Sequence, residues 1–212
     1  MHRRIQARRK HVTEQIVTDK ADLRRSLRAK RKDHVAAIDD KVRALLLMRP
    51  PAAVTDLLEA DDVIGLYHAM GDEAPTRAYA KHFQENGYRI ALPYFAEENA
   101  AMEFREYTDP FADDDLESGP FDIPQPRSEA PLLDPDILFV PLIGFTEEGH
   151  RLGQGKGHYD RFLGANLVRQ RIGLAWDAQL VAEMPVEQHD EPLDMIVTPT
   201  RLFGPFEKRA AR

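Results

Sequence analysis

The stretch of residues 136–163, DILFVPLIGFTEEGHRLGQGKGHYDRFL, joins an apolar run, a glycine-rich loop and a segment with helix-forming composition. Its first part, Ile137–Val140, has the length and composition of a buried strand. Residues 159–167 favour a helix, so the loop is expected to end at a helix N-terminus. A buried strand followed by a helix is the building unit of an α/β domain.

The same alternation continues on both sides of this stretch. Further strands are predicted over residues 63–67, 89–95, 102–107, 172–175 and 195–197, and further helices over 18–38, 39–48, 76–87 and 179–183. Thr18 or Asp19 is expected to cap the first of these helices and Thr76 the third, and the second is expected to have an apolar face of Val42, Leu45 and Leu46. Residues 109–136, rich in Pro, Gly and acids, are expected to form a long crossing segment. The pattern predicts a single α/β domain over residues 18–205, with a mobile basic extension at 1–17 and a tail at 206–212.

Composition limits the classes of protein to which the chain belongs. With 212 residues, 42% of them hydrophobic and 31% charged, the chain is expected to be a soluble globular domain with a substantial core. The absence of cysteine excludes disulfides, thiolate metal sites and cysteine nucleophiles, and is compatible with a cytoplasmic location. No apolar run is long enough to cross a bilayer, and the N-terminus lacks the apolar centre of a secretory signal.

Charge is unevenly distributed along the chain. Residues 1–32 are basic, residues 97–136 are acidic, and the formal net charge is −7 at pH 7. An acidic protein is a poor non-specific ligand for nucleic acid, so neither a nucleic acid nor a membrane is the expected partner. A monomer and a homodimer are both compatible with the sequence.

The glycine-rich loop has the composition of an anion site. Gly153, Gly155 and Gly157 alternate with Arg151 and Lys156. Glycine lets backbone N–H groups approach an anion, and the helix that follows adds its dipole. The alternative is a flexible, solvated loop, because the spacing fits neither a Walker A motif nor GxGxxG. The interpretation that we favour is a phosphate-binding loop.

Polar residues elsewhere are expected to meet this loop. Loops 68–75, 144–158 and 176–190 all follow predicted strands, so they converge at one edge of a parallel sheet. Lys20, Arg24 and Arg28 are spaced four apart on the first helix and form either a lid over polyphosphate or a solvated stripe. Asp160, directly after the glycines, and Asp190 are candidate ligands for Mg²⁺.

Several motifs in the same order resemble the 5-formyltetrahydrofolate cyclo-ligase family. They are Lys20-x-x-x-Arg24, YHAMGDEAPT, IPQP, RLGxGxGxYD and MPVEQHDEPLDMIVTP, and the resemblance extends over residues 19–199. It implies a three-layer α/β/α domain with a mainly parallel central sheet, like that of the CoA-transferases. It also implies a reaction of 5-formyltetrahydrofolate with ATP, dependent on Mg²⁺, that gives 5,10-methenyltetrahydrofolate, ADP and phosphate through a phosphorylated formyl intermediate.

The resemblance also assigns roles to individual positions. Arg151 and Lys156 match the catalytic phosphate cations, and Asp160 and Asp190 match the Mg²⁺ ligands. The residues that match ATP-binding positions are Lys20, Arg24, Arg151, Leu152, Gly153, Gln154, Gly155, Lys156, Gly157, His158 and Tyr159. Those that match folate-binding positions are His68, Glu73, Gln154, Gly155, Lys156, Gly157 and His158.

Two positions depart from the family pattern. His158 stands where the family has tyrosine, and Tyr94 stands where a basic residue is frequent. An imidazole stacks and hydrogen-bonds, so His158 is expected to tune activity rather than abolish it. The apolar residues Met70, Tyr94, Phe95 and Trp176 are expected either to line the site or to pack in the core.

Two other functions remain open at this point. One is an ATP-dependent enzyme of the same fold that acts on a different acceptor. The other is a non-catalytic module that binds a phosphate ligand or RNA. Retention of Lys156 and Asp160 favours a catalytic protein over the second alternative.

Overall fold

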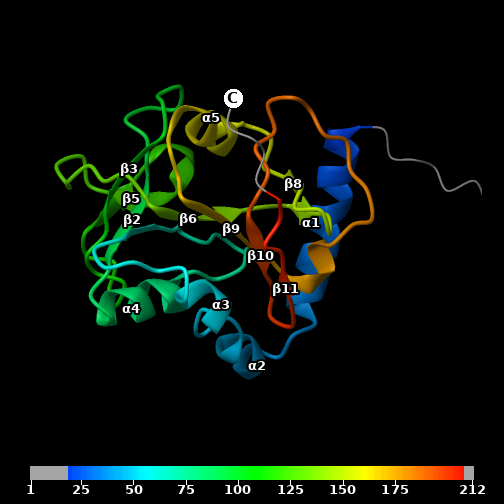
Figure 1. The fold of residues 1–212 in the computed structure, drawn as a ribbon, viewed down its shortest axis with the longest axis horizontal. Helices are drawn as coiled ribbons and strands as arrows, with labels where there is room; N and C mark the ends of the chain where they lie inside the picture. The colour runs from blue at the N-terminus through cyan, green and yellow to red at the C-terminus, as the bar shows by residue number, and fades with distance from the viewer. Residues whose placement is uncertain (1–18, 208–212) are drawn as a thin grey trace, which may run out of the picture.

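The structure, a computed structural model, describes residues 19–207 and has a mainly parallel sheet at its centre (Figure 1). The predicted extension 1–17, Thr18 and most of the predicted tail lie outside the described residues. The sheet is built from β1 Val63–Gly65, β2 Arg89–Tyr94, β3 Glu103–Glu106, β6 Ile137–Pro141, β9 Gln170–Leu174, β10 Met195–Val197 and β11 Leu202–Phe203. Their order is β11-β10-β9-β6-β1-β2-β3. Only the edge strands β3 and β11 pair antiparallel within this sheet.

Helices cover both faces of the sheet, as the three-layer prediction requires. They are α1 Lys20–Ala36, α2 Asp40–Leu45, α3 Ala52–Thr55, α4 Arg77–Glu85 and α5 His158–Ala165. Figure 1 shows α5 on one side of β6 and β9 and α3 and α4 on the other. None of the helices in residues 19–207 has the length and apolar character of a bilayer-spanning segment.

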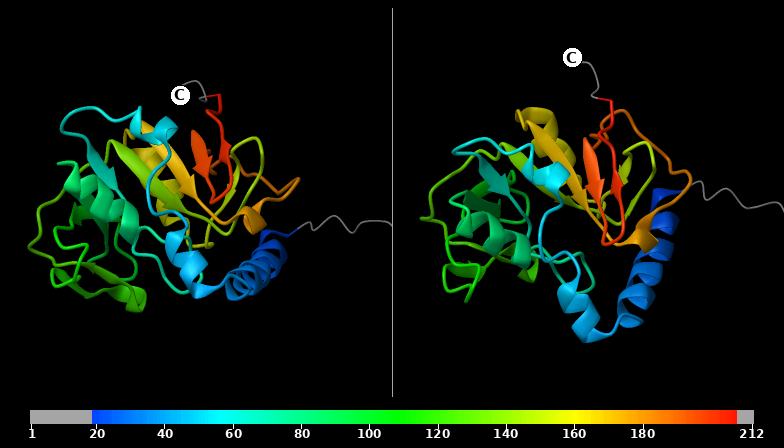
Figure 2. Two further views of the ribbon diagram at one scale, coloured as in Figure 1. Left: turned by 90° about the horizontal axis from the view of Figure 1, so that it is seen from below. Right: turned by 60° about the horizontal axis from the view of Figure 1, so that its bottom comes forward.

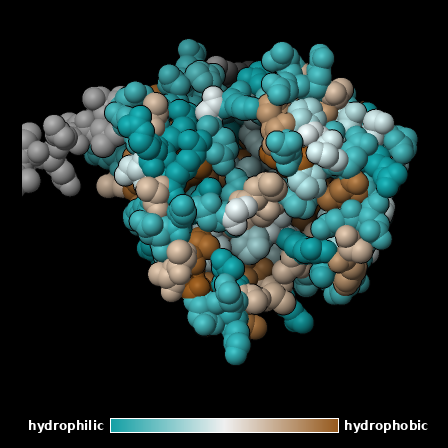
Figure 3. Space-filling model, turned by 180° about the vertical axis from the view of Figure 1, so that it is seen from behind, coloured by the Kyte–Doolittle hydropathy of each residue, from teal (hydrophilic) through white to brown (hydrophobic). Residues whose placement is uncertain are grey.

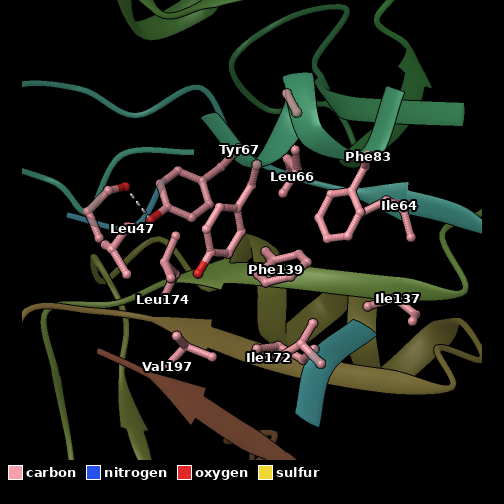
Figure 4. Packing of buried hydrophobic residues seen from close by; sticks show 14 of the residues in the cluster. Leu47, Ile64, Leu66, Tyr67, Phe83, Ile137, Phe139, Ile172, Leu174 and Val197 are labelled. Atoms are coloured by element: carbon pink, nitrogen blue, oxygen red, sulfur yellow. Dashed lines mark hydrogen bonds between the residues drawn. The ribbon is translucent and has the colours of Figure 1, made fainter. Parts of the chain in front are cut away.

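Alternate side chains of each strand enter different cores. Ile137 and Phe139 of β6 pack with Tyr79 and Phe83 of α4, and Figure 4 shows how closely this cluster is filled. Leu138 and Val140 point to the opposite face and belong to the cluster that contains Phe162 and Leu163 of α5. The period of two in a strand therefore divides one apolar run between two layers.

Helix α1 lies at the side of the domain away from α4 (Figures 1 and 2). Asp19 caps it by accepting a hydrogen bond from the Ala21 N–H at 2.9 Å, as the sequence predicted. Leu23 and Leu27 pack against Ile143 and Leu152, which flank the glycine-rich loop. The basic side of α1 is thereby brought to the loop.

The chain also forms two short hairpins that the sequence did not predict. One is β4 Leu116–Ser118 with β5 Pro124–Pro126, inside the segment expected to be a simple crossing. The other is β7 Gly144–Phe145 with β8 Arg151–Leu152, inside the glycine-rich stretch. Both are too short to leave a periodic signal, and they depend on pairing with the body of the domain.

Three local predictions were wrong. No helix forms at 179–183; a 3₁₀ turn, η2 Asp177–Gln179, takes its place, and the Gln179 side chain bonds to the N–H of Trp176 and the carbonyl of Leu142. Thr76 precedes α4, but its hydroxyl donates to the Tyr67 carbonyl instead of capping the helix. Helix α2 ends at Leu45, and that side chain is 74% exposed, so the expected apolar face is not buried.

Candidate active site

The main cavity of the described residues has a volume of about 620 Å³ and opens where β1 and β6 end. It is bounded by α1, the glycine-rich loop, the 68–73 loop, residues 120–125 and residues 187–190. The face shown in Figure 3 is largely hydrophilic with separate apolar patches. Every residue predicted to bind ATP, folate or Mg²⁺ lines this cavity: Lys20, Arg24, His68, Glu73, Arg151, Leu152, Gly153, Gln154, Gly155, Lys156, Gly157, His158, Tyr159, Asp160 and Asp190.

The glycine-rich loop begins as the β7–β8 hairpin and ends at α5. Gly155 and Gly157 have φ values of 109° and 67°, which side-chain-bearing residues rarely adopt. Gly157 is also the N-cap position of α5, so its conformation turns the chain into that helix. The loop thus leads directly into a helix N-terminus, the arrangement predicted for an anion site.

The basic stripe of α1 faces this loop. Arg24 donates to the Gly153 carbonyl at 2.9 Å, and Arg28 donates to both oxygens of Gln154, the carbonyl at 3.0 Å and the side-chain amide at 3.1 Å. Because Lys20, Arg24 and Arg28 all line the cavity, the stripe is not merely a solvated surface. Its cations lie beside the glycine-rich loop, and the lid remains a prediction.

Arg151 and Asp160 form an ion pair at the base of the loop. The guanidinium donates to Asp160 Oδ1 at 2.5 Å, and the Arg151 side chain is only 3% exposed. The same Asp160 oxygen accepts the Glu191 N–H at 3.2 Å. The Nε of Arg151 is buried and has no hydrogen-bond partner within residues 19–207.

His68 and Glu73 come from the loop after β1. Glu73 accepts the Met70 N–H at 3.0 Å with one carboxylate oxygen and the Gln154 side-chain amide at 2.8 Å with the other. Burial raises the pKa of Glu73 and lowers that of His68. The Nδ1 of His68 is buried without a hydrogen-bond partner in the described part of the chain. The Gln154 side chain, which also accepts from Arg28, connects these polar groups to the cationic wall.

Aromatic rings line another wall. The His158 ring lies 4.7 Å from that of Phe95 and 5.9 Å from that of Phe121, measured between ring centroids. The Lys156 ammonium sits 3.2 Å from the centre of the Phe121 ring. Burial, together with the charges of Arg161 and Lys156, lowers the pKa of His158. The lowered pKa favours the neutral imidazole, whose ring meets that of Phe95 edge to face where the family pattern has tyrosine.

Comparison with known proteins now decides the family. The sequence profile of the 5-formyltetrahydrofolate cyclo-ligase family matches residues 16–199. The chain belongs to this family. Among curated relatives named 5-formyltetrahydrofolate cyclo-ligase, the one from Mus musculus is 27% identical over 82% of this chain and 92% of its own length. The one from Haemophilus influenzae is 32% identical over 63% of this chain and 74% of its own length.

Other relatives match over shorter segments. The Escherichia coli cyclo-ligase is 44% identical, but the match spans 36% of this chain and only 43% of that relative's length. Among solved structures, the 5,10-methenyltetrahydrofolate synthetase of Aquifex aeolicus superposes with a TM-score of 0.69 at 23% identity, over 91% of this chain and 96% of the other. The synthetase of Mycoplasma pneumoniae has a TM-score of 0.59 at 23% identity, over 84% and 98%. These superpositions confirm the fold.

Some cavity residues of this cyclo-ligase family member were not predicted. Phe121, Glu187 and Gln125 also line the cavity. The buried Gln125 side chain bonds to the N–H and carbonyl of Phe95, both at 3.1 Å, and so holds the aromatic wall. Its place in the IPQP motif was a signal of importance, but the motif alone gives no role for the glutamine.

The four apolar residues weighed as site or core divide evenly. Met70 and Phe95 line the cavity. Trp176 is 1% exposed and packs in the core with Tyr67 and Leu174. Tyr94 is also buried, and the Arg105 guanidinium lies 4.4 Å from the centre of its ring.

The carboxylates of the cavity suit a hard cation. Asp160 and Asp190 both line it, and Glu187, His189 and Asp190 place one ligand atom each within 4.8 Å of one another. Oxygen donors from one or two carboxylates are what Mg²⁺ uses beside a phosphate. Asp190 also holds Lys20, whose ammonium lies 2.7 Å from one carboxylate oxygen and 3.0 Å from the other. The donor set fits Mg²⁺, provided that Asp190 shares its oxygens with Lys20.

The Lys20–Asp190 pair makes stability depend on pH. Burial raises the pKa of Asp190, but the contacts with Lys20, the Glu187 N–H and the charge of His189 together leave that pKa lowered from 3.8. A carboxyl group of this kind stabilises the fold above its unfolded pKa, and the effect is lost as pH falls through the folded pKa. Replacing Asp190 by asparagine should lower the free energy of unfolding by about 1 kcal/mol at pH 7.

Denaturant unfolding of both proteins between pH 7 and pH 3 measures this difference. We expect the difference in free energy of unfolding to become smaller as the pH falls below 3.8. Asp40→Asn is the control, because that side chain is 87% exposed in its pair with Arg43. If the difference in free energy of unfolding between the wild type and Asp190→Asn stayed constant from pH 7 to pH 3, the charge of Asp190 would not contribute to stability.

Proposed function

We propose that the protein uses ATP to convert 5-formyltetrahydrofolate to 5,10-methenyltetrahydrofolate, with release of ADP and phosphate. The observation that carries the proposal is the composition of one cavity. Lys20, Arg24 and Arg28 lie on one of its walls, and the rings of Phe95 and Phe121 lie on another. A polyphosphate fits the first wall and a flat heterocycle the second.

The reaction needs charge neutralisation more than it needs a nucleophilic side chain. The formyl oxygen attacks the γ-phosphorus of ATP, and the bond from that phosphorus to ADP breaks. N10 then attacks the formyl carbon, phosphate leaves with the formyl oxygen, and a proton is lost as the ring closes. Arg151 and Lys156 are the cations of the loop that face the transferred phosphoryl group in this proposal. Phosphoryl transfer depends chiefly on such positioned charges.

In this proposal the glycine-rich loop is a wall that the two substrates share. ATP phosphates would lie along the backbone of Gly153–Gly157 beneath Lys20 and Arg24. Folate would lie along Gln154–His158, with its pterin toward His68 and Glu73. A carboxylate accepts paired hydrogen bonds from the amino and ring N–H groups of a pterin, which is the role we assign to Glu73.

Asp160 and Asp190 are the residues that would hold Mg²⁺ in this mechanism. When bound, the ion neutralises phosphate oxygens of ATP. Arg151, which donates to Asp160, keeps that carboxylate oriented toward the cavity. The chain's own contribution is therefore a fixed array of cations and carboxylates around the phosphates.

A direct assay tests the proposal. The protein, Mg-ATP and 5-formyltetrahydrofolate are mixed, the absorbance of 5,10-methenyltetrahydrofolate is followed, and ADP is measured in the same sample. We expect equal amounts of the two products and no turnover without Mg²⁺. Absence of turnover at micromolar enzyme would contradict the proposal. ATP binding without folate binding would then favour a different acceptor, and binding of phosphate ligands alone a non-catalytic module.

A further inference from the structure

Arg31 continues the basic side of α1 beyond Arg28 but has a different environment. It does not line the cavity, and its side chain is only 8% exposed. Its Nε donates to Asp72 Oδ2 at 3.1 Å, and the Asp72 side chain is 30% exposed. A guanidinium buried to this degree, paired with a half-buried carboxylate, requires a physical reason, since charged groups are seldom buried.

Asp72 belongs to the turn that presents Glu73 to the cavity. The turn spans residues 70–73: the Glu73 N–H donates to the Met70 carbonyl at 3.1 Å, and the Met70 N–H returns a bond to the Glu73 carboxylate at 3.0 Å. Gly71 has a φ of 58° within it. The turn is held from outside by the Arg31 side chain and by the Trp176 indole, which donates to the Asp72 carbonyl at 2.9 Å.

Anchoring of α1 does not explain the pair. Leu23 and Leu27 bury the first half of the helix, and Val35 buries its end in the main core. A buried ion pair is also a weak contributor to stability, because desolvation offsets its attraction. What the pair does supply is a fixed distance between α1 and the turn.

Arg31 also acts on the charge of Glu73. Burial raises the pKa of Glu73, and the negative charge of Asp72 adds to that rise. The hydrogen bond from Met70, the positive charge of Arg31 and the hydrogen bond from Gln154 oppose it. An ionised Glu73 is the form that accepts two hydrogen bonds from a donor pair. The bond from Arg31 to Asp72 holds the turn, and the charge of Arg31 favours an ionised Glu73, so both effects prepare Glu73 to accept hydrogen bonds.

We propose that Arg31 is a positioning residue, which fixes the 70–73 turn so that the Glu73 carboxylate faces the glycine-rich loop and stays available to a bound pterin. This inference rests on the proposed function. One rigid helix then holds both parts of the site, because Arg24 and Arg28 bind the loop at Gly153 and Gln154 while Arg31 binds the turn. The phosphate cradle and the pterin end keep a constant separation.

Steady-state kinetics of Arg31→Met test the inference. We expect the KM for 5-formyltetrahydrofolate to rise about tenfold, with kcat within about threefold and the KM for ATP within about twofold, because only binding at the pterin end is weakened. Arg31→Lys keeps the charge, so its KM for 5-formyltetrahydrofolate should lie between that of the wild type and that of Arg31→Met. The matched control is Arg25→Met on the same helix, where the side chain is 80% exposed and its ion pair within residues 19–207 is with Asp22.

A second variant and a second readout complete the test. Asp72→Asn should give the same selective rise in the folate KM, and it keeps the shape of the turn should Arg31→Met fail to fold. Trp176 is the only tryptophan of the chain, so its fluorescence reports on the turn even without turnover. We expect Arg31→Met to change that emission and Arg25→Met to leave it unchanged.

The outcomes separate this inference from the proposed function. The positioning role would be overturned if Arg31→Met raised the KM for ATP and the KM for folate equally. It would also be overturned if the Trp176 emission and the folate KM of Arg31→Met were like those of Arg25→Met. An inactive wild-type protein would instead contradict the cyclo-ligase reaction, and the Trp176 emission would still decide whether Arg31 holds the turn.

Discussion

Replacing Lys156 by methionine should lower kcat for the cyclo-ligase reaction by about 10²-fold or more while the protein remains folded. Lys156 lies on the glycine-rich loop, lines the cavity and has its ammonium 3.2 Å from the centre of the Phe121 ring. In the proposed mechanism this ammonium neutralises charge that develops on the transferred phosphoryl group. Methionine keeps the apolar stem and its contact with the ring but has no charge, so the loss falls on the chemical step.

Lys81→Met is the matched control for this substitution. Its ammonium also lies over an aromatic ring, 4.7 Å from the centre of Phe111, but Lys81 does not line the cavity. We expect kcat within about twofold of the wild type for Lys81→Met, because only a surface cation–π contact is lost. Initial rates at saturating ATP and folate measure both variants. A kcat for Lys156→Met within about threefold of the wild type would show that the phosphate assignment is wrong.

The sequence predicted the centre of the fold better than its edges. Ile137–Val140 reads as a buried strand because both faces of β6 are covered by helices, so an uninterrupted apolar run is required there. Strands such as β8 and β11 contain two residues each and exist only because a neighbouring segment pairs with them. Such pairing depends on tertiary position, and the hydrophobic periodicity of a two-residue segment carries no information about its neighbours in space.

The wrong helix at 179–183 has a comparable cause. Composition allows a helix there, but the Gln179 side chain already bonds to Trp176, Leu142 and Ile143. Those contacts fix a 3₁₀ turn and leave the following residues without a helical start. The competing interactions come from residues about 36 positions away in the chain, so propensity alone could not have found them.

The site residues that could be predicted from the sequence are those with a suitable side chain that also follow a predicted strand. Glycines and cations after a strand, and carboxylates after other strands, meet at one sheet edge because parallel strands end there. Phe121 and Arg31 could not be assigned in this way. Phe121 reaches the cavity through a segment that crosses back over β2, and Arg31 acts through Asp72, 41 residues later in the chain.

Asp160→Ala should reduce both stability and activity, and the two effects can be separated. Arg151 is 3% exposed and its ion-pair partner is Asp160, so removal of the carboxylate leaves an uncompensated buried charge. We expect the free energy of unfolding to fall by about 3 kcal/mol. The rate should fall by about 10²-fold, because Asp160 is also a proposed ligand of Mg²⁺. Denaturant unfolding and initial rates over a range of Mg²⁺ concentrations measure the two effects.

Glu191→Ala is the control for the loss of a neighbouring carboxylate. Its pair with Arg171 has side chains 27% and 24% exposed, and Glu191 does not line the main cavity. The bond from its backbone N–H to Asp160 survives the substitution, since no side-chain atom takes part. We expect a loss of less than about 1 kcal/mol and no change in Mg²⁺ dependence.

The double variant Arg151→Met/Asp160→Ala distinguishes structural from catalytic roles. Methionine and alanine remove both charges, so the desolvation penalty that destabilises Asp160→Ala disappears and most of the lost stability should return. Activity should not return, because two charged groups that face the phosphates are then missing. Recovery of turnover along with stability would show that the pair only maintains the fold. Recovery of stability alone would place Arg151 and Asp160 in the chemistry of the site.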